Sequence, residues 1–261
     1  MIACQGASGA WFIISYGTYF MLVSGLNVSD AFKFSIMTTS IGFIGVNVGM
    51  YLMRHVWGRR TILMAGATFA GLCHLSFAVA ATAAPNSIYL RNCIIAFISL
   101  FKFGYNGGVG AASYPVATEL VSTRLRAWTV GSATSLGYFL AWLISFCTPY
   151  FINPKNLNWV SLAIFTLILS INLLTFGKGA KYGYIWAASN FICVVFFFFF
   201  MPELKGRSLE SIDELFVNKV PARKFKGFQT TIGEDAAREV ERKMFGEKGE
   251  IVAEIQEKER A

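Results

Sequence analysis

Long apolar segments alternate with short polar ones through the first 201 residues of this 261-residue chain. A helix needs about 20 predominantly apolar residues to cross a membrane, and seven segments meet or approach that length. They are residues 7–26, 34–53, 61–82, 92–117, 128–151, 160–176 and 184–201. After Pro202 the chain becomes polar. The pattern therefore predicts an all-α polytopic membrane protein, with a transmembrane helix bundle over residues 1–201 and a charged cytoplasmic tail over residues 202–261.

The composition and the distribution of charge also predict a membrane protein. Hydrophobic residues make up 55% of the chain and charged residues 15%, whereas soluble domains are about 25% charged. Of the 15 acidic residues only Asp30 and Glu119 precede Pro202, whereas 11 of the 23 basic residues do so. These numbers exclude a secreted disulfide scaffold, a disordered chain and a conventional cytosolic enzyme. Because the cations lie between apolar segments and not along one basic face, no nucleic-acid partner is expected.

The basic residues between the apolar segments predict how the helices are oriented. Arg59 and Arg60 follow the second segment, and Arg124 and Arg126 follow the fourth. Lys and Arg concentrate in cytoplasmic loops, so both of these loops are expected inside the cell. The first five segments obey this alternation. Segment 160–176 does not obey it. One crossing after the fifth segment returns the tail to the cytoplasm, whereas two crossings would leave the tail outside.

Four polar motifs stand out against this apolar background. Gln5 precedes a Tyr-Gly-Thr-Tyr-Phe stretch at residues 16–20, and Gly-Arg-Arg occupies residues 58–60. Residues 114–126 combine Tyr-Pro, a lone Glu and Arg-Leu-Arg at the end of the fourth segment. Residues 202–216 read Pro-Glu-Leu-Lys-Gly-Arg-Ser-Leu-Glu-Ser-Ile-Asp-Glu-Leu-Phe. Taken singly, each motif has an ordinary explanation, such as a topology anchor, a charged helix stop or an interfacial polar group.

Together and in this order, the motifs resemble the sugar porter family of the major facilitator superfamily, and more closely the fungal hexose and α-glucoside permeases. Residues 202–216 are similar to the signature that follows the last helix of that family. The resemblance covers residues 5–216, apart from 160–176. It implies a six-helix C-terminal half of a major facilitator fold, matching helices seven to twelve of the family, plus one extra apolar segment.

This resemblance also implies a function. Sugar porters move a hexose or an α-glucoside across the membrane by alternating access, without chemistry on the substrate and therefore without enzymatic activity. The implied partners are the sugar, the lipid bilayer and a missing N-terminal half, and the implied location is the plasma membrane. Proton-coupled relatives carry their proton on an acidic residue of that other half, so proton symport and facilitated diffusion both remain open.

The resemblance assigns four residues to substrate binding. Gln5 matches the first glutamine of a paired-glutamine motif that bonds sugar hydroxyls, with an interhelical polar contact as the alternative. Tyr16 and Tyr19 resemble the outer gate, although tyrosines of an interfacial belt give the same pattern. Tyr114 aligns with an aromatic residue that covers the sugar, with core packing as the alternative. The second glutamine of the pair is replaced by Gly6, which leaves the sugar specificity open.

A cytoplasmic latch is also implied, which holds the inner ends of the helices together while the transporter faces outward. Glu119 lies at the cytoplasmic end of an apolar segment, seven residues before Arg126, and this favours a paired charge over a solvated one. Ion pairs shielded from water are costly to half-break, so such a latch stabilises one of two states. The residues expected in the latch are Gly58, Arg59, Arg60, Glu119, Arg126, Glu203 and Arg207.

No other chemistry is expected from the sequence. The five cysteines are scattered without zinc or redox spacing and are predicted to be small buried hydrophobes. A glycine-rich run at residues 104–110 follows no strand and lies in an apolar segment, so it indicates close helix packing and not a nucleotide-binding loop. No catalytic triad, metal site or cofactor is expected.

Segment 160–178 has no counterpart in the family. There, an Asn-Pro-x-x-x-Asn-Trp loop, found here at residues 153–159, leads within a few residues into a Gly-Lys-rich stretch like that at residues 179–186. The hypothesis is that residues 160–178 are the translated sequence of a retained short intron, since their removal restores the expected topology. The alternative is a re-entrant or interfacial helix.

Two other functions fit the sequence. The chain is then either a truncated fragment that transports nothing, or a membrane sensor or interaction protein that acts through its tail. Sugar-dependent uptake separates transport from both alternatives. Capture of a partner by the tail without uptake favours the sensor.

Overall fold

The computed structural model describes residues 1–23, 26–83, 88–122, 124–152, 183–207, 209–228 and 230–231. Within these residues every regular element is helical, which confirms the all-α prediction. The chain divides into two compact units, Met1–Met201 and Pro202–Ala261.

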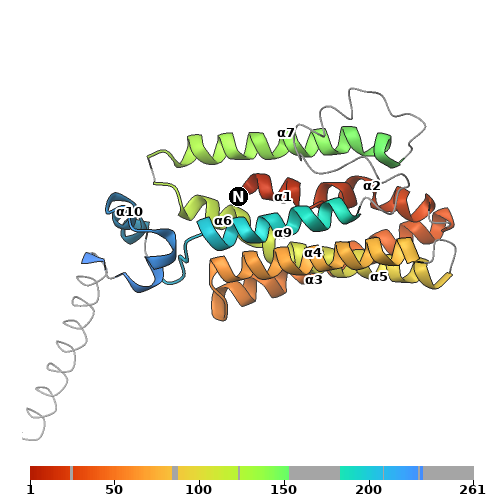
Figure 1. The fold of residues 1–261 in the computed structure, drawn as a ribbon, viewed down its shortest axis with the longest axis horizontal. Helices are drawn as coiled ribbons and strands as arrows, with labels where there is room; N and C mark the ends of the chain where they lie inside the picture. The colour runs from red at the N-terminus through yellow and green to blue at the C-terminus, as the bar shows by residue number, and fades with distance from the viewer. Residues whose placement is uncertain are drawn as a thin grey trace, which may run out of the picture. The chain divides into compact units, whose positions relative to one another are not determined.

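The first unit is a bundle whose long helices run side by side (Figure 1). Helix α4 packs against α9 and α5, α3 packs against α5 and η1, and α7 packs against α1 and α2. In chain order the elements are α1 (Ile2–Ala7), α2 (Ala10–Val23), α3 (Val28–His55), α4 (Arg59–Ala83), α5 (Ile88–Tyr105), η1 (Asn106–Gly110), α6 (Ala111–Glu119), α7 (Arg126–Ile152) and α9 (Gly183–Phe200).

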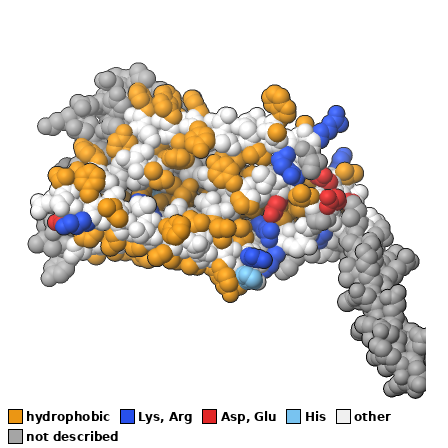
Figure 2. All heavy atoms as spheres, turned by 180° about the vertical axis from the view of Figure 1, so that it is seen from behind, with side chains coloured by type: hydrophobic (Ala, Val, Ile, Leu, Met, Phe, Trp, Pro, Cys, Tyr) orange, Lys and Arg blue, Asp and Glu red, His pale blue; other side chains and the backbone are white. Residues whose placement is uncertain are grey.

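Five continuous helical stretches of the described residues are long and apolar enough to cross a membrane. They are Val28–His55, Arg59–Ala80, Asn92–Glu119, Arg126–Thr148 and Gly183–Phe200. They correspond to the predicted segments 34–53, 61–82, 92–117, 128–151 and 184–201. Hydrophobic side chains spread over the long face of these helices, with Lys and Arg side chains near the helix ends (Figure 2). The predicted segment 160–176, and with it the intron hypothesis for residues 160–178, lies outside the described residues.

The first predicted segment, residues 7–26, contains helix α2, and a break at its N-terminal edge separates α2 from α1. Helix α1 ends at Ala7 and α2 begins at Ala10, and Gly9 between them has a φ of +79°. Only glycine adopts that left-handed conformation without steric cost. A β-carbon on Gly9 would also lie 2.7 Å from Cγ of Trp186 on α9. Hydropathy reports how apolar a segment is, but it does not reveal a break that depends on neighbouring helices.

Those neighbours supply hydrogen bonds to the broken backbone. The Ser8 carbonyl oxygen accepts from Nδ2 of Asn190 at 3.0 Å and from Nε2 of His74 at 3.2 Å. Asn190 also donates to the Trp186 carbonyl oxygen at 2.7 Å, and both Asn190 and His74 are buried. A helix that breaks within a membrane must find such replacement partners for its backbone groups. The break therefore ties α1 to α4 and α9.

The element η1 is a π-helix that joins α5 and α6 into one long span. A β-carbon on Gly49 of α3 would overlap the Gly107 carbonyl oxygen, and one on Gly66 of α4 would lie 2.6 Å from Cα of Gly108. The backbones of α3 and α4 therefore approach η1 without side chains between them. This confirms that the glycine-rich run 104–110 serves close helix packing.

The second unit contains α10 (Leu209–Val217) and the short 3-10 helix η4 (Ala222–Gly227). The rings of Phe216 and Phe225 meet edge to face, with 5.4 Å between their centroids. The Arg207 guanidinium donates to the carbonyl oxygens of Phe225 and Phe228, the second at 2.7 Å. The signature after the last span thus folds into a small ordered segment of its own.

Candidate functional site: a polar cavity and an interhelical ion pair

A cavity of about 300 Å³ lies among α2, α3 and α5–η1 of the first unit. Its walls are mainly apolar, but hydroxyl, amide and ammonium groups also line it. Besides Lys102, the polar residues are Thr18, Ser35, Thr38, Thr39, Tyr105 and Asn106. Binding pockets for small molecules are typically apolar clefts of this size or larger, with a few polar groups that fix the ligand's orientation.

Lys102 is the charged residue of this cavity. It lies ten residues after the start and 17 before the end of the span Asn92–Glu119. Its ammonium donates to Oγ1 of Thr38 at 3.1 Å and to Oγ1 of Thr39 at 3.2 Å. Both threonine hydroxyls donate to the Ser35 carbonyl oxygen, at 3.0 and 2.8 Å, which leaves their lone pairs for the ammonium.

A charge in this position is unusual in a membrane helix. A Lys at the centre of such a helix costs about 2.5–3.5 kcal/mol on insertion scales, and charged groups at this depth are characteristically functional. Only two carboxylates precede Pro202, and each has a basic neighbour. Asp30 lies 3.4 Å from Nζ of Lys33, and Glu119 pairs with Arg59. Lys102 therefore has hydroxyl partners but no carboxylate partner within the described part of this unit. Lys102 was not among the site residues predicted from the sequence, although a lone cation inside segment 92–117 is a signal that the sequence contains.

The four residues predicted to bind substrate do not gather around this cavity, and none belongs to its described lining. Gln5 is buried in α1. The Tyr16 hydroxyl donates to the Ser145 carbonyl oxygen of α7 at 2.9 Å. Tyr19 on α2 and Tyr114 on α6 are 47% and 39% exposed. Their assignment to the substrate remains a prediction.

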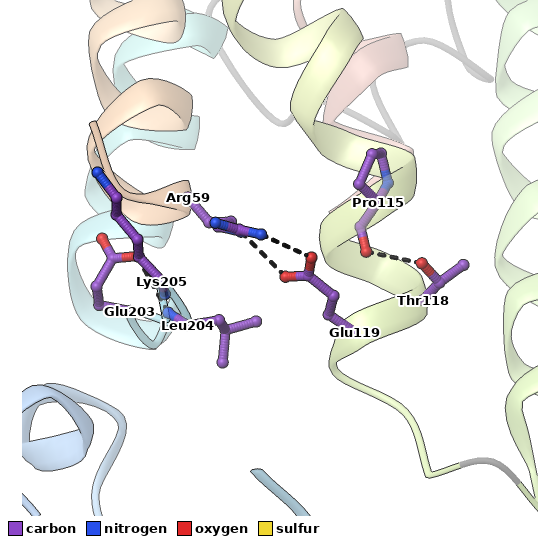
Figure 3. A network of polar contacts seen from close by, with 7 residues as sticks. All are labelled: Arg59, Pro115, Thr118, Glu119, Glu203, Leu204 and Lys205. Atoms are coloured by element: carbon purple, nitrogen blue, oxygen red, sulfur yellow. Dashed lines mark hydrogen bonds and ion pairs between the residues drawn. The ribbon is translucent and has the colours of Figure 1, made fainter. Parts of the chain in front are cut away.

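Among the predicted latch residues, the structure brings Arg59 and Glu119 together across α4 and α6. Nε of Arg59 donates to Oε2 of Glu119 at 3.2 Å and Nη2 donates to Oε1 at 3.1 Å (Figure 3). The two side chains are each 25% exposed. A bidentate pair of this kind combines charge with a fixed geometry, and it is partly shielded from water. The helix ends that carry these two residues are thereby joined.

The neighbouring Arg60 makes a different contact from the same helix start. Its Nη2 donates to the Phe198 carbonyl oxygen in the last turn of α9 at 2.5 Å, and its guanidinium lies 5.3 Å from the centroid of the Phe198 ring. A cation at a helix C-terminus satisfies carbonyl groups that have no partner within the helix. Arg60 therefore fastens α4 to the end of α9.

The other predicted latch residues make local contacts. Gly58 precedes α4, and its carbonyl oxygen accepts from the Ile62 amide at 3.1 Å. The Arg126 guanidinium donates to the Val121 carbonyl oxygen at 3.3 and 3.4 Å. In the second unit the Glu203 carboxylate accepts from the backbone amides of Leu204 and Lys205, both at 3.1 Å (Figure 3). Arg207 holds η4 as described above.

Five membrane-length helical stretches, a broken helix and a polar cavity within an apolar bundle define a multi-pass integral membrane protein. Broken helices that border a polar site are typical of secondary transporters. The family described as "Sugar (and other) transporter" matches residues 1–216, and the chain belongs to this family.

Relatives from two yeasts have similar sequences. A "General alpha-glucoside permease" of Saccharomyces cerevisiae is 29% identical over 221 residues, which cover 85% of this chain and 32% of that protein. A "High-affinity fructose transporter" of Schizosaccharomyces pombe is 27% identical over 84% of this chain and 38% of its own length. A "High glucose sensor" of S. cerevisiae is 27% identical over 82% of this chain and 25% of its own length. The chain spans about a third of the length of the relatives it matches.

Proposed function

We propose that this chain is the C-terminal half of a transporter that moves a sugar, a hexose or an α-glucoside, across the plasma membrane by alternating access. The observation that carries this proposal is the polar cavity within the bundle of a sugar transporter family member. A buried sugar hydroxyl needs hydrogen-bond partners, because an unpaired one costs about 1–3 kcal/mol. The cavity provides hydroxyl, amide and ammonium groups for this purpose. Gln5, Tyr16, Tyr19 and Tyr114 are assigned to further substrate contacts that form as the two halves close.

The same proposal assigns a conformational role to the helix ends. The Arg59–Glu119 pair joins α4 to α6 in this structure, and separation of these ends would break both of its hydrogen bonds. Such a pair biases an equilibrium between two states, and a bound ligand shifts that equilibrium through its different affinity for each state. Gly58, Arg60, Arg126, Glu203 and Arg207 complete the proposed latch.

Sugar uptake tests this function directly. The chain is expressed in yeast cells that lack their own hexose and maltose transporters, alone and together with a separately encoded six-helix N-terminal half of an α-glucoside permease. Uptake of labelled glucose or maltose is expected with the companion half. Gln5→Ala is expected to reduce this uptake about tenfold, because the proposed buried hydrogen bond between Gln5 and the sugar is lost. The matched control is Asn47→Ala, because this exposed side chain donates to the Phe43 carbonyl oxygen of its own helix. Absence of uptake from correctly inserted protein contradicts the proposal.

A sensor is the second candidate, favoured by the relative named as a high glucose sensor and by the folded segment that follows the last span. Glucose-dependent capture of a cytoplasmic protein by residues 202–261, in the absence of uptake, would support it. Loss of that capture on Arg207→Ala is then expected, because Arg207 holds η4 in place.

A further inference from the structure

A neutral sugar does not account for the charge on Lys102. The hydroxyls of Thr38 and Thr39 already accept from its ammonium, and Thr18, Ser35 and Asn106 provide uncharged partners for sugar hydroxyls. If the cavity closed over a neutral solute, it would remove water from a cation without providing an opposite charge. An anionic solute would compensate this charge within the cavity.

The first unit does not supply this charge itself. Its sequence contains two carboxylates, Asp30 and Glu119, and both lie at helix ends beside Lys33 and Arg59. Two of the three ammonium donors of Lys102 point to threonine hydroxyls, so one remains for a further acceptor at the cavity. The threonine hydroxyls are fixed by their own bonds to Ser35, so the ammonium is held in place before a ligand arrives.

We propose that the cavity binds a solute with a single carboxylate, a sugar acid, whose carboxylate accepts a hydrogen bond from Nζ of Lys102. This inference rests on the proposed transport function and specifies its substrate class. One ammonium matches one carboxylate charge, whereas a phosphate group carries about −1.5 to −2 at neutral pH and would need further cations, which the described lining of the cavity does not contain. The hydroxyls of the sugar acid would meet Thr18, Ser35 and Asn106.

The test compares D-galacturonate with D-galactose, which differ in a carboxylate against a hydroxymethyl group at carbon six. Binding of both labelled solutes is measured on the full chain in lipid nanodiscs. The variants are Lys102→Met, which keeps length but removes charge, and Lys102→Arg, which keeps the charge. The control is Lys33→Met, which removes an exposed lysine at the outer end of α3. Circular dichroism and thermal melting establish that every variant is folded.

The wild-type chain is expected to bind galacturonate at least about tenfold more tightly than galactose, as for a charge-assisted hydrogen bond. Lys102→Met is expected to remove this preference, so that galacturonate no longer binds more tightly than galactose. Lys102→Arg is expected to retain most of the preference, and Lys33→Met is expected to bind both solutes as the wild type does.

Four results would overturn the proposal. Equal or tighter binding of galactose by the wild type would refute the substrate class while leaving sugar transport intact. A preference for galacturonate that survives in Lys102→Met would show that another group recognises the acid. Binding of neither solute would refute both the substrate class and the proposed sugar site. The same binding measurement, repeated with the N-terminal companion half present, tests whether a carboxylate of that half neutralises Lys102. If the preference for galacturonate is lost when the two halves assemble, a carboxylate of the companion half pairs with Lys102. That result also overturns the assignment of Lys102 to the carboxylate of a solute.

Discussion

At the scale of single residues, the bundle is shaped by backbone groups that a broken helix leaves without their usual partners. Gly9 adopts a left-handed conformation, and the Ser8 carbonyl oxygen beside it turns to His74 and Asn190 on two other helices. Ser8 is buried, so these side chains provide the hydrogen bonds that a continued helix would otherwise provide to the backbone. The break is therefore a property of three helices and not of α1 alone.

Gly9→Ala is expected to destabilise the bundle by about 2 kcal/mol or more, because alanine is strained at positive φ and its β-carbon would meet the Trp186 ring at 2.7 Å. Thermal melting in detergent, followed by circular dichroism, measures the change. The control is Gly17→Ala in α2, where the β-carbon would make an ordinary 3.7 Å contact with Ile13. If both variants melt at the same temperature, the conformation of Gly9 does not matter to stability.

The Arg59–Glu119 pair is a second interaction between individual residues. We expect Arg59→Gln and Glu119→Gln to destabilise the bundle singly and to show a coupling of about 1 kcal/mol in a double-mutant cycle, since both groups are 25% exposed. Unfolding in mixed micelles gives the four free energies. The exchanged pair, Arg59→Glu with Glu119→Arg, is expected to regain part of the loss. A coupling near zero would show that the two charges are independent.

At the scale of elements, the span Asn92–Glu119 is assembled from α5, the π-helix η1 and α6. A π-helical turn in an α-helix is rare and is frequently found at functional sites. Here Asn106 and Tyr105 at its start line the cavity, and its glycines admit the backbones of α3 and α4. The irregular element therefore both lines the cavity and allows close packing of α3 and α4 against it.

Gly49→Ala tests this packing. Its β-carbon would overlap the Gly107 carbonyl oxygen, and neither backbone is able to move aside as a flexible side chain does. We expect a loss of about 1–3 kcal/mol and a melting temperature several degrees lower. Gly131→Ala is the matched control in α7, since no atom lies within 4 Å of its added β-carbon. An unchanged melting temperature for Gly49→Ala would mean that α3 and η1 lie farther apart in the membrane than they do in this structure.

At the scale of the whole molecule, the alternation of the helices assigns each turn to one side of the membrane. The turns that carry Arg59 and Arg126 are predicted to be cytoplasmic, and the turn between α2 and α3 is predicted to be outside. Asn27 and Leu125 lie in turns of opposite predicted location, and both are exposed.

Cysteine labelling tests the orientation. In a background with all five native cysteines replaced by serine, Asn27→Cys is expected to react with a membrane-impermeant maleimide on intact cells. Leu125→Cys is expected to react only after the cells are permeabilised. The reverse pattern would invert the predicted topology, and with it the side on which the Arg59–Glu119 pair lies.

The class of protein, five membrane-length helices and the family were all predictable from the amino-acid sequence. Hydropathy sums over neighbouring residues, so segments such as 34–53 and 184–201 are readable without knowledge of their partners. Residues 202–216 form a contiguous signature, and this made the family recognisable.

Contacts between residues far apart in the sequence were not predictable in the same way, because they depend on how the helices pack. The break at Gly9 depends on Trp186 and Asn190, which follow it by more than 170 residues. Arg59 and Glu119 were expected in a latch of seven residues, and the packing of α4 and α6 brings these two side chains together. Lys102 was one of 11 basic residues before Pro202, and the hydroxyls of another helix made it the charged centre of a cavity. Apolar length is a local property of the chain, whereas a site depends on which faces of distant helices come into contact.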